Sequence, residues 1–194
     1  MQLVPTELPE VLEVRPVRHG DERGWFSEVY KSHVLAAAGV DLHFVQDNES
    51  FSATVGTLRG LHYQLPPQAQ AKLVRVTSGA ILDVAVDLRR SSPTFGRWVS
   101  RTLTATDGNQ LLIPIGFGHG FCTLEQDTQV MYKVTAPYAP DLERSIRWDD
   151  PRLGIDWPAE LTEPVVSAKD AVAPALSDQP DLFDGPQAPG ESRR

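Results

Sequence analysis

The middle of the chain is a succession of short apolar runs, and this pattern narrows the accessible folds more than any other feature. The runs lie between residues 44 and 134 and read FVQDNESFS, GTLRGLHYQL, KLVRVTSGAILDVAVDL, GRWVSRTLT, NQLLIPIGFGHGF and TQVMYKV. They are rich in Val, Ile, Thr and aromatic residues, which favour strands, and Gly, Pro, Asn and Asp separate them. Because no helices alternate with these runs, the pattern predicts an all-β sandwich or barrel rather than a βαβ fold.

Few helical signals interrupt this pattern. The stretch KSHVLAAA, from Lys31 to Ala38, predicts one short helix that Ser32 caps and Gly39 ends. The pair Ser78-Gly79 between two apolar runs predicts a tight turn.

The last part of the chain has a different composition, in which proline, glycine and charge replace the apolar periodicity. This change predicts a domain over residues 1–175 and a poorly ordered tail over 176–194. A short segment docked through Leu182 and Phe183 is the alternative for part of the tail.

Charge and composition exclude several classes of protein. The 194 residues include 18 Lys and Arg against 26 Asp and Glu, a net charge of −8. So acidic a chain is a poor binder of nucleic-acid backbones, and cations that hold an anionic ligand must be placed locally. The single Cys122 excludes an internal disulfide and a multi-cysteine metal site. No apolar run reaches the length of a membrane span and no signal pattern opens the chain, so we expect a cytoplasmic protein without a membrane partner.

The segment LRGLHYQ contains two candidate functional residues, Arg59 and His62. In a half-buried strand such polar side chains often face only water. Strict alternation would place Arg59 and His62 on opposite faces, but a bulge at Gly60 would re-aim one of them, as happens near active sites.

A second histidine, His119, lies among three glycines in IPIGFGHGF, where the backbone could approach a ligand closely or where the histidine is only structural. Metal sites in small barrels usually need two histidines close together on one strand and a carboxylate. Position 64 is Gln64, and no H-x-H motif is present. We therefore predict that no metal is bound.

Three further residues have both a structural and a chemical interpretation. Tyr132 is either a packing aromatic or a proton donor. It can be a donor because a phenol, with a pKa of about 10, is protonated at neutral pH. Lys72 is either a solvated strand residue or part of a cationic lining for phosphate or an oxyanion. Asp83, inside the apolar run ILDVAVD, needs a partner if it is buried and could orient a histidine.

Several of these segments, in this order, resemble the dTDP-4-dehydrorhamnose 3,5-epimerase family, a branch of the cupin-like barrels. The matching pieces include FVQDNESFS, GTLRGLHYQ, SPTFG, IPIGFGHGF and YKVTAPYAPDLERSIRWDDPRLGIDWP. The resemblance covers about residues 15 to 174, most of the chain. It implies a double-stranded β-helix (jelly-roll) barrel with a few short helices. It also implies a homodimer that exchanges N-terminal strands, and neither a metal nor a nucleotide cofactor.

The same resemblance assigns roles to individual residues. His62 falls on the general base, Tyr132 on the proton donor and Asp170 on the aspartate that pairs with the histidine; Asp83 is the second choice for that pairing. Substrate-contacting positions fall on Arg23, Phe26, Glu28, Gln46, Asn48, Arg59, Lys72, His119, Tyr138, Glu143 and Lys169, with Tyr138 against the thymine ring. Two departures are Val166 in place of the usual leucine, and Pro137-Tyr138 where many relatives have two tyrosines.

These roles imply epimerisation of dTDP-4-dehydro-6-deoxy-D-glucose at C3 and C5 to dTDP-4-dehydro-L-rhamnose. A ketone at C4 acidifies the hydrogens on C3 and C5, so a base, an acid on the opposite face and a cation for the enolate oxygen are needed. The nearest alternative is an epimerase of another deoxysugar pathway that inverts only one carbon. A metal-dependent cupin and a non-catalytic sugar-nucleotide-binding protein are alternatives of other classes.

Overall fold

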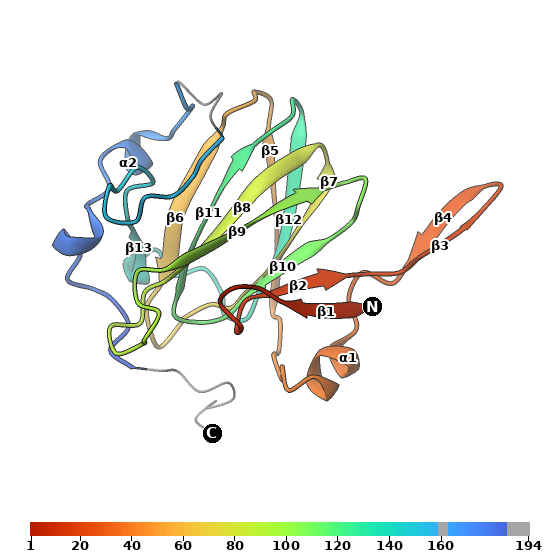
Figure 1. The fold of residues 1–194 in the computed structure, drawn as a ribbon, viewed down its shortest axis with the longest axis horizontal. Helices are drawn as coiled ribbons and strands as arrows, with labels where there is room; N and C mark the ends of the chain where they lie inside the picture. Colours follow the sequence, from red (N-terminus) through yellow and green to blue (C-terminus); the bar gives the residue numbers. More distant parts are fainter. Residues whose placement is uncertain (159–162, 186–194) are drawn as a thin grey trace.

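The protein is a jelly-roll barrel made of two β-sheets, seen in a computed structural model that describes residues 1–158 and 163–185 (Figure 1). The first sheet contains, in order, β1 (Gln2–Pro5), β2 (Leu12–Arg15), β10 (Gln110–Ile113), β7 (Lys72–Ser78), β12 (Thr128–Val134) and β5 (Gln46–Ser52). The second contains β13 (Glu143–Ser145), β6 (Leu58–Gln64), β11 (Phe117–Thr123), β8 (Ala80–Asp87) and β9 (Trp98–Thr104). The predicted all-β fold is confirmed.

The main core lies between the sheets, where both present aliphatic and aromatic side chains. Val74 and Val130 come from the first sheet, and Ile81, Ala85 and Phe121 come from the second. Side chains alternate along each strand, so the neighbours Val84 and Val86 of β8 belong to another apolar cluster, on the outer face of the second sheet. Strand β8 is therefore apolar on both sides, as its sequence suggests.

The C-terminal segment covers this outer face. Leu182 and Phe183 are buried, and Phe183 forms an isolated bridge with Arg89. The Tyr63 hydroxyl donates to the carbonyl of Asp181 over 2.5 Å. Residues 176–185 thus differ from the predicted tail, because their few apolar side chains dock on the barrel; residues 186–194 of that tail lie outside the described residues.

Helices are few and short among the described residues: α1 (Ser32–Ala37), α2 (Ala168–Ala171) and two 3-10 turns (Pro140–Leu142 and Leu176–Asp178). The predicted first helix is present, but its cap is not. Lys31 occupies the N-cap position and no side chain caps the helix, because the helix begins at Ser32 itself. No helix in the described ranges is long and apolar enough to cross a membrane.

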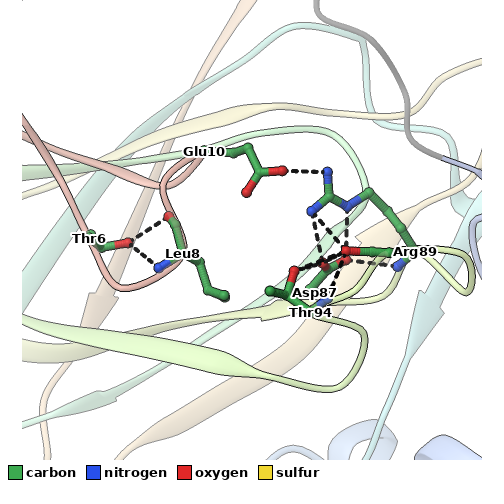
Figure 2. A network of polar contacts seen from close by, with 7 residues as sticks. Thr6, Leu8, Glu10, Asp87, Arg89 and Thr94 are labelled. Carbon is green, nitrogen blue, oxygen red and sulfur yellow. Dashed lines mark hydrogen bonds and ion pairs between the residues drawn. The ribbon is translucent and has the colours of Figure 1, made fainter.

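A buried polar network fixes the loop after β8 to the N-terminal segment (Figure 2). Arg89 donates to both oxygens of Asp87 at 2.8 Å and to Glu10 at 3.0 Å. Ser92 and Thr94 also donate to Asp87, at 2.5 and 2.6 Å. Every oxygen of this buried carboxylate is therefore satisfied, as a buried charge requires.

One element stands apart from the barrel. Strands β3 (Arg18–Asp21) and β4 (Gly24–Ser27) form a two-stranded hairpin that extends away from both sheets (Figure 1). Two large aromatic side chains on it, Trp25 and Phe26, are 60% and 66% exposed. Large apolar side chains that are exposed in this way are often found at interaction sites.

Candidate active site

A bulge in β6 brings two candidate residues to the same side of the second sheet. His119 of β11 lies opposite His62 and Phe121 lies opposite Arg59, so between these pairs two residues of β6 face one residue of β11. The backbone of Gly60 has φ +120°, and a Cβ there would lie 2.5 Å from the Cα of Gly120. Only glycine fits this close crossing. The bulge considered from the sequence is present, and it turns Arg59 and His62 towards the barrel interior.

His62 is held by a carboxylate 108 residues away. Its Nε2 lies 2.6 Å from Oδ1 of Asp170, and Asp170 is 3% exposed. Asp170 is in the short helix α2, where its amide donates to the N-cap residue Ser167. Burial alone would raise the pKa of Asp170, but the hydrogen bond and charge of His62 outweigh it and lower that pKa. The pair can accept a proton on the histidine and stabilise the imidazolium that forms.

A second histidine–carboxylate pair lies beside the first. His119 Nε2 is 2.7 Å from Oδ1 of Asp83, and the two side chains are 7% and 0% exposed. Burial lowers the pKa of His119, although the charge of Asp83 and its hydrogen bond act in the opposite direction. Asp83 therefore contacts His119 and not His62; Asp170 occupies the position for which Asp83 was the second choice.

The first sheet supplies the opposite wall of the interior. Tyr132 of β12 packs against the main core and lies opposite Asn48 of β5, while Gln46 lies opposite Val134. Directly paired residues point to the same side, so Gln46 and Asn48 share the inner face with Tyr132. Burial raises the pKa of Tyr132. The phenol therefore stays protonated over the physiological range, as a proton donor must.

Lys72 begins β7 on the same inner face, opposite Val134. It is 9% exposed, and its Nζ reaches the carbonyl of His62 at 3.5 Å. Burial lowers the pKa of Lys72 to about 8, against the charges of Asp83 and Glu143, which raise it. A cation is thus placed beside His62, where it can stabilise negative charge on a bound oxygen.

A polar cluster lies at the open end of the interior. The Tyr138 hydroxyl donates to Oε2 of Glu143 at 2.8 Å, and Lys169 forms an ion pair with the same oxygen. The Tyr138 amide donates to Gln46 at 3.3 Å, and the Gln46 amide group donates to Asn48 at 2.7 Å. Five of the predicted substrate-contacting residues therefore form one hydrogen-bonded group.

Of the six predicted contact residues outside this group, three lie on the hairpin or next to it. Arg23 pairs with Asp21 at 2.5 Å on the exposed hairpin, and Phe26 lies on the same hairpin. Glu28, just beyond β4, pairs with Lys31. The structure of one chain therefore divides the predicted site into an interior part and a hairpin part.

Gln64 has a structural role that was not predicted from the sequence. It is 3% exposed; its Oε1 accepts from the amide of Ala139 at 2.9 Å and its Nε2 donates to the carbonyl of Pro137 at 2.9 Å. It thereby fixes both neighbours of Tyr138. The available signal was its spacing, since Gln64 is two residues beyond His62 and so on the same face of β6.

Metal-binding capacity can be tested on the side chains themselves. Within residues 1–158 and 163–185, no group of three or more His, Cys, Asp and Glu side chains is arranged to hold a metal ion. His62 and His119 each use Nε2 for a carboxylate. Each histidine–carboxylate pair can take up and release a proton.

Fold and site together define a class: a jelly-roll protein with acid–base groups and a cation in its interior. The family described as dTDP-4-dehydrorhamnose 3,5-epimerase matches residues 5–178 of the chain. The chain belongs to this family of isomerases.

Individual relatives agree with this assignment. A dTDP-4-dehydrorhamnose 3,5-epimerase of Sinorhizobium fredii is 52% identical over 91% of this chain and 90% of its own. A solved epimerase structure from Legionella pneumophila, in complex with dTDP-4-keto-L-rhamnose, is 44% identical with a TM-score of 0.90, and the match covers 96% of this chain and 99% of that one. A less similar structure, a 3'-monoepimerase of Streptomyces bikiniensis in complex with dTDP-quinovose, is 37% identical with a TM-score of 0.83 over 89% and 87%.

Proposed function

We propose that this enzyme epimerises dTDP-4-dehydro-6-deoxy-D-glucose at C3 and C5 to dTDP-4-dehydro-L-rhamnose, in dTDP-L-rhamnose biosynthesis. The observation that carries the proposal is the His62–Asp170 contact of 2.6 Å inside the barrel, beside a buried lysine. Recognition of a nucleotide sugar alone needs no such pair. The similarity to epimerases over most of the chain supports the substrate.

In this mechanism His62 is the base. It removes the proton from the carbon next to the C4 ketone, and Asp170 stabilises the imidazolium and holds one tautomer. Lys72 stabilises the enolate oxygen; one such donor typically contributes about 3–4 kcal/mol to lowering the barrier. Tyr132, from the opposite sheet, returns a proton to the other face of the carbon, which inverts it.

The proposed partners are the nucleotide sugar and a second copy of the chain, in the cytoplasm. The homodimer is supported by the hairpin, whose Trp25 and Phe26 are exposed. In such a dimer, Arg23, Phe26 and Glu28 contact the substrate held in the interior of the partner subunit. Sedimentation of the chain with and without residues 18–27 tests this arrangement: loss of the dimer together with activity supports it, and an active monomer contradicts it.

The central experiment is incubation with dTDP-4-keto-6-deoxyglucose in deuterated water, with NMR of the product. Deuterium at both C3 and C5 is expected, and His62→Asn should abolish both. Exchange at the normal rate in that variant would show that His62 is not the base.

A matched variant separates the base from the acid. Tyr132→Phe keeps the ring, which packs against the core, and removes only the hydroxyl. Abstraction by His62 can continue, so inversion should fall more than exchange. If inversion is fully retained, Tyr132 is not the donor.

The second candidate function is inversion of a single carbon. It is favoured by the similarity to the 3'-monoepimerase, whose fold the chain shares. The same deuterium measurement decides between the two, since a single labelled carbon after complete turnover would replace the 3,5-epimerase proposal.

A further inference from the structure

Two buried carboxylates on strand β8 differ in how they are satisfied. Asp83 and Asp87 are both 0% exposed. Both oxygens of Asp87 accept hydrogen bonds from Arg89, and Oδ2 also accepts from neighbouring hydroxyls. Asp83 Oδ1 contacts His119, but its Oδ2 is buried without a hydrogen-bond partner among the described residues.

A buried carboxylate with one unsatisfied oxygen destabilises the fold unless a nearby positive charge compensates it. Lys72 is the candidate, because it is also buried and the contact of its Nζ with the carbonyl of His62 is long, at 3.5 Å. A short series of contacts brings the two groups to the same part of the interior: Lys72 reaches the carbonyl of His62, His62 lies opposite His119, and His119 contacts Asp83. The charge of Asp83 accordingly raises the pKa of Lys72 against the effect of burial. Each group can therefore compensate the buried charge of the other.

We propose that Asp83 is a positioning residue of the epimerase: its Oδ1 orients His119, and its otherwise unpartnered Oδ2 makes it the buried counter-ion of Lys72 beside the place where the enolate forms. Because His119 is in the second sheet and Lys72 is in the first, Asp83 acts on residues of both sheets, although it does not itself contact the substrate. The enolate part of the proposal rests on the proposed function, whereas the coupling between Asp83 and Lys72 does not.

The other groups facing Lys72 define the background for this effect. They come from the elements packed around it and are His62 of β6, His119 of β11, Tyr132 of β12 and Glu143 of β13. Of these, Glu143 also raises the pKa of Lys72, but it is 18% exposed at the side chain and already pairs with Lys169. Asp83 is the fully buried anion and has the larger effect on Lys72.

The test follows Lys72 directly. The chain has four lysines, so the Cε and Nζ resonances are few, and Lys72→Arg identifies the signal. In the unaltered protein we expect Lys72 to titrate near pH 8, still charged at neutral pH. A Lys72 that is already neutral below about pH 7 would overturn the proposal without any variant.

The variant Asp83→Asn keeps the size of the side chain and removes its charge. It should lower the titration of Lys72 by about one pH unit or more, as expected for a charge at close range. The matched control is Asp87→Asn, which removes an equally buried charge from the same strand and should leave Lys72 unchanged. Equal effects in both variants, or none in Asp83→Asn, would contradict the coupling.

Activity supplies the second readout. If the titration of Lys72 falls by about one unit, its charged fraction at pH 8 falls about fivefold, whereas at pH 6 it hardly changes. The kcat/KM of Asp83→Asn should therefore fall about fivefold more at pH 8 than at pH 6. A loss equal at both pH values, together with an unshifted titration of Lys72, indicates a structural role and overturns the proposal. If Lys72 shifts but the pH profile does not, the coupling stands and the assignment of Lys72 to the enolate is wrong.

Discussion

Replacing Gly60 by alanine tests whether the bulge in β6 builds the active site. The new Cβ would lie 2.5 Å from the Cα of Gly120 and 2.7 Å from the carbonyl oxygen of His119. Both are backbone atoms, so neither can move away as a flexible side chain would. The residue also has φ +120°, which alanine rarely adopts.

The expected cost has two parts. A strained backbone conformation costs about 1–3 kcal/mol, and overpacking a close contact costs a further 1–3 kcal/mol or so. The sum, about 2–6 kcal/mol, is a large share of the roughly 5–15 kcal/mol that stabilises a typical domain. Because relief requires β6 and β11 to separate, His62 and His119 move too. A displacement of about 1 Å in such a site can lower kcat about 100-fold.

Urea unfolding followed by tryptophan fluorescence, at one protein concentration, measures the first effect, and deuterium exchange into the substrate measures the second. Gly24→Ala is the control, because Gly24 has φ +129° but no atom within 4 Å of its added Cβ. It isolates the cost of the backbone conformation. If Gly60→Ala loses no more stability than Gly24→Ala and exchanges at the normal rate, the close crossing does not build the site.

Three further predictions concern other contacts. Asp170→Asn should slow exchange at least about tenfold, since the imidazolium of His62 loses its buried anion; an unchanged rate would exclude the pairing from the mechanism. Phe183→Ala, at a buried position of the C-terminal segment, should lower the free energy of unfolding by about 3–5 kcal/mol, while Val172→Ala, which is 80% exposed, should change it little; equal effects would mean that the segment is not docked. Burial would raise the pKa of Asp87, but hydrogen bonds from the adjacent guanidinium and hydroxyls lower it, so its contribution to stability is present above about pH 4 and lost as the pH falls through its lowered pKa. The destabilisation by Asp87→Asn in urea should therefore shrink on acidification, and a constant difference would contradict this.

The strands could be predicted because their signal is local. Each apolar run corresponds to one or two strands of the barrel, and the predicted turn at Ser78-Gly79 joins β7 to β8, with Gly79 at φ +77°. The register between strands could not be predicted from the local sequence. Counting residues places Arg59 and His62 on opposite faces, and only the crossing with Gly120 of another strand decides that they share one.

The partners of the histidines could be assigned only with the fold. His62 and Asp170 are 108 residues apart, and Asp83 is a buried acid that suits either histidine equally in sequence. The docking of Phe183 could likewise be assigned only with the fold. Two apolar residues in a proline-rich stretch carry little information until the outer face of β6 and β8 exists to receive them.

One chain does not bring all of the predicted contact residues together, because three of them lie on the hairpin or next to it. Its predicted contact residues are Arg23 and Phe26, and Glu28 follows directly; none of them takes part in the polar cluster around Tyr138 and Glu143. An acidic chain with a net charge of −8 needs local cations to bind a pyrophosphate, and Arg23 is such a cation on a projecting element. In the proposed homodimer, this arginine would lie over the interior of the partner subunit. Because the site is then completed only on association, specific activity should fall on dilution below the dimer dissociation constant, in parallel with the loss of dimer.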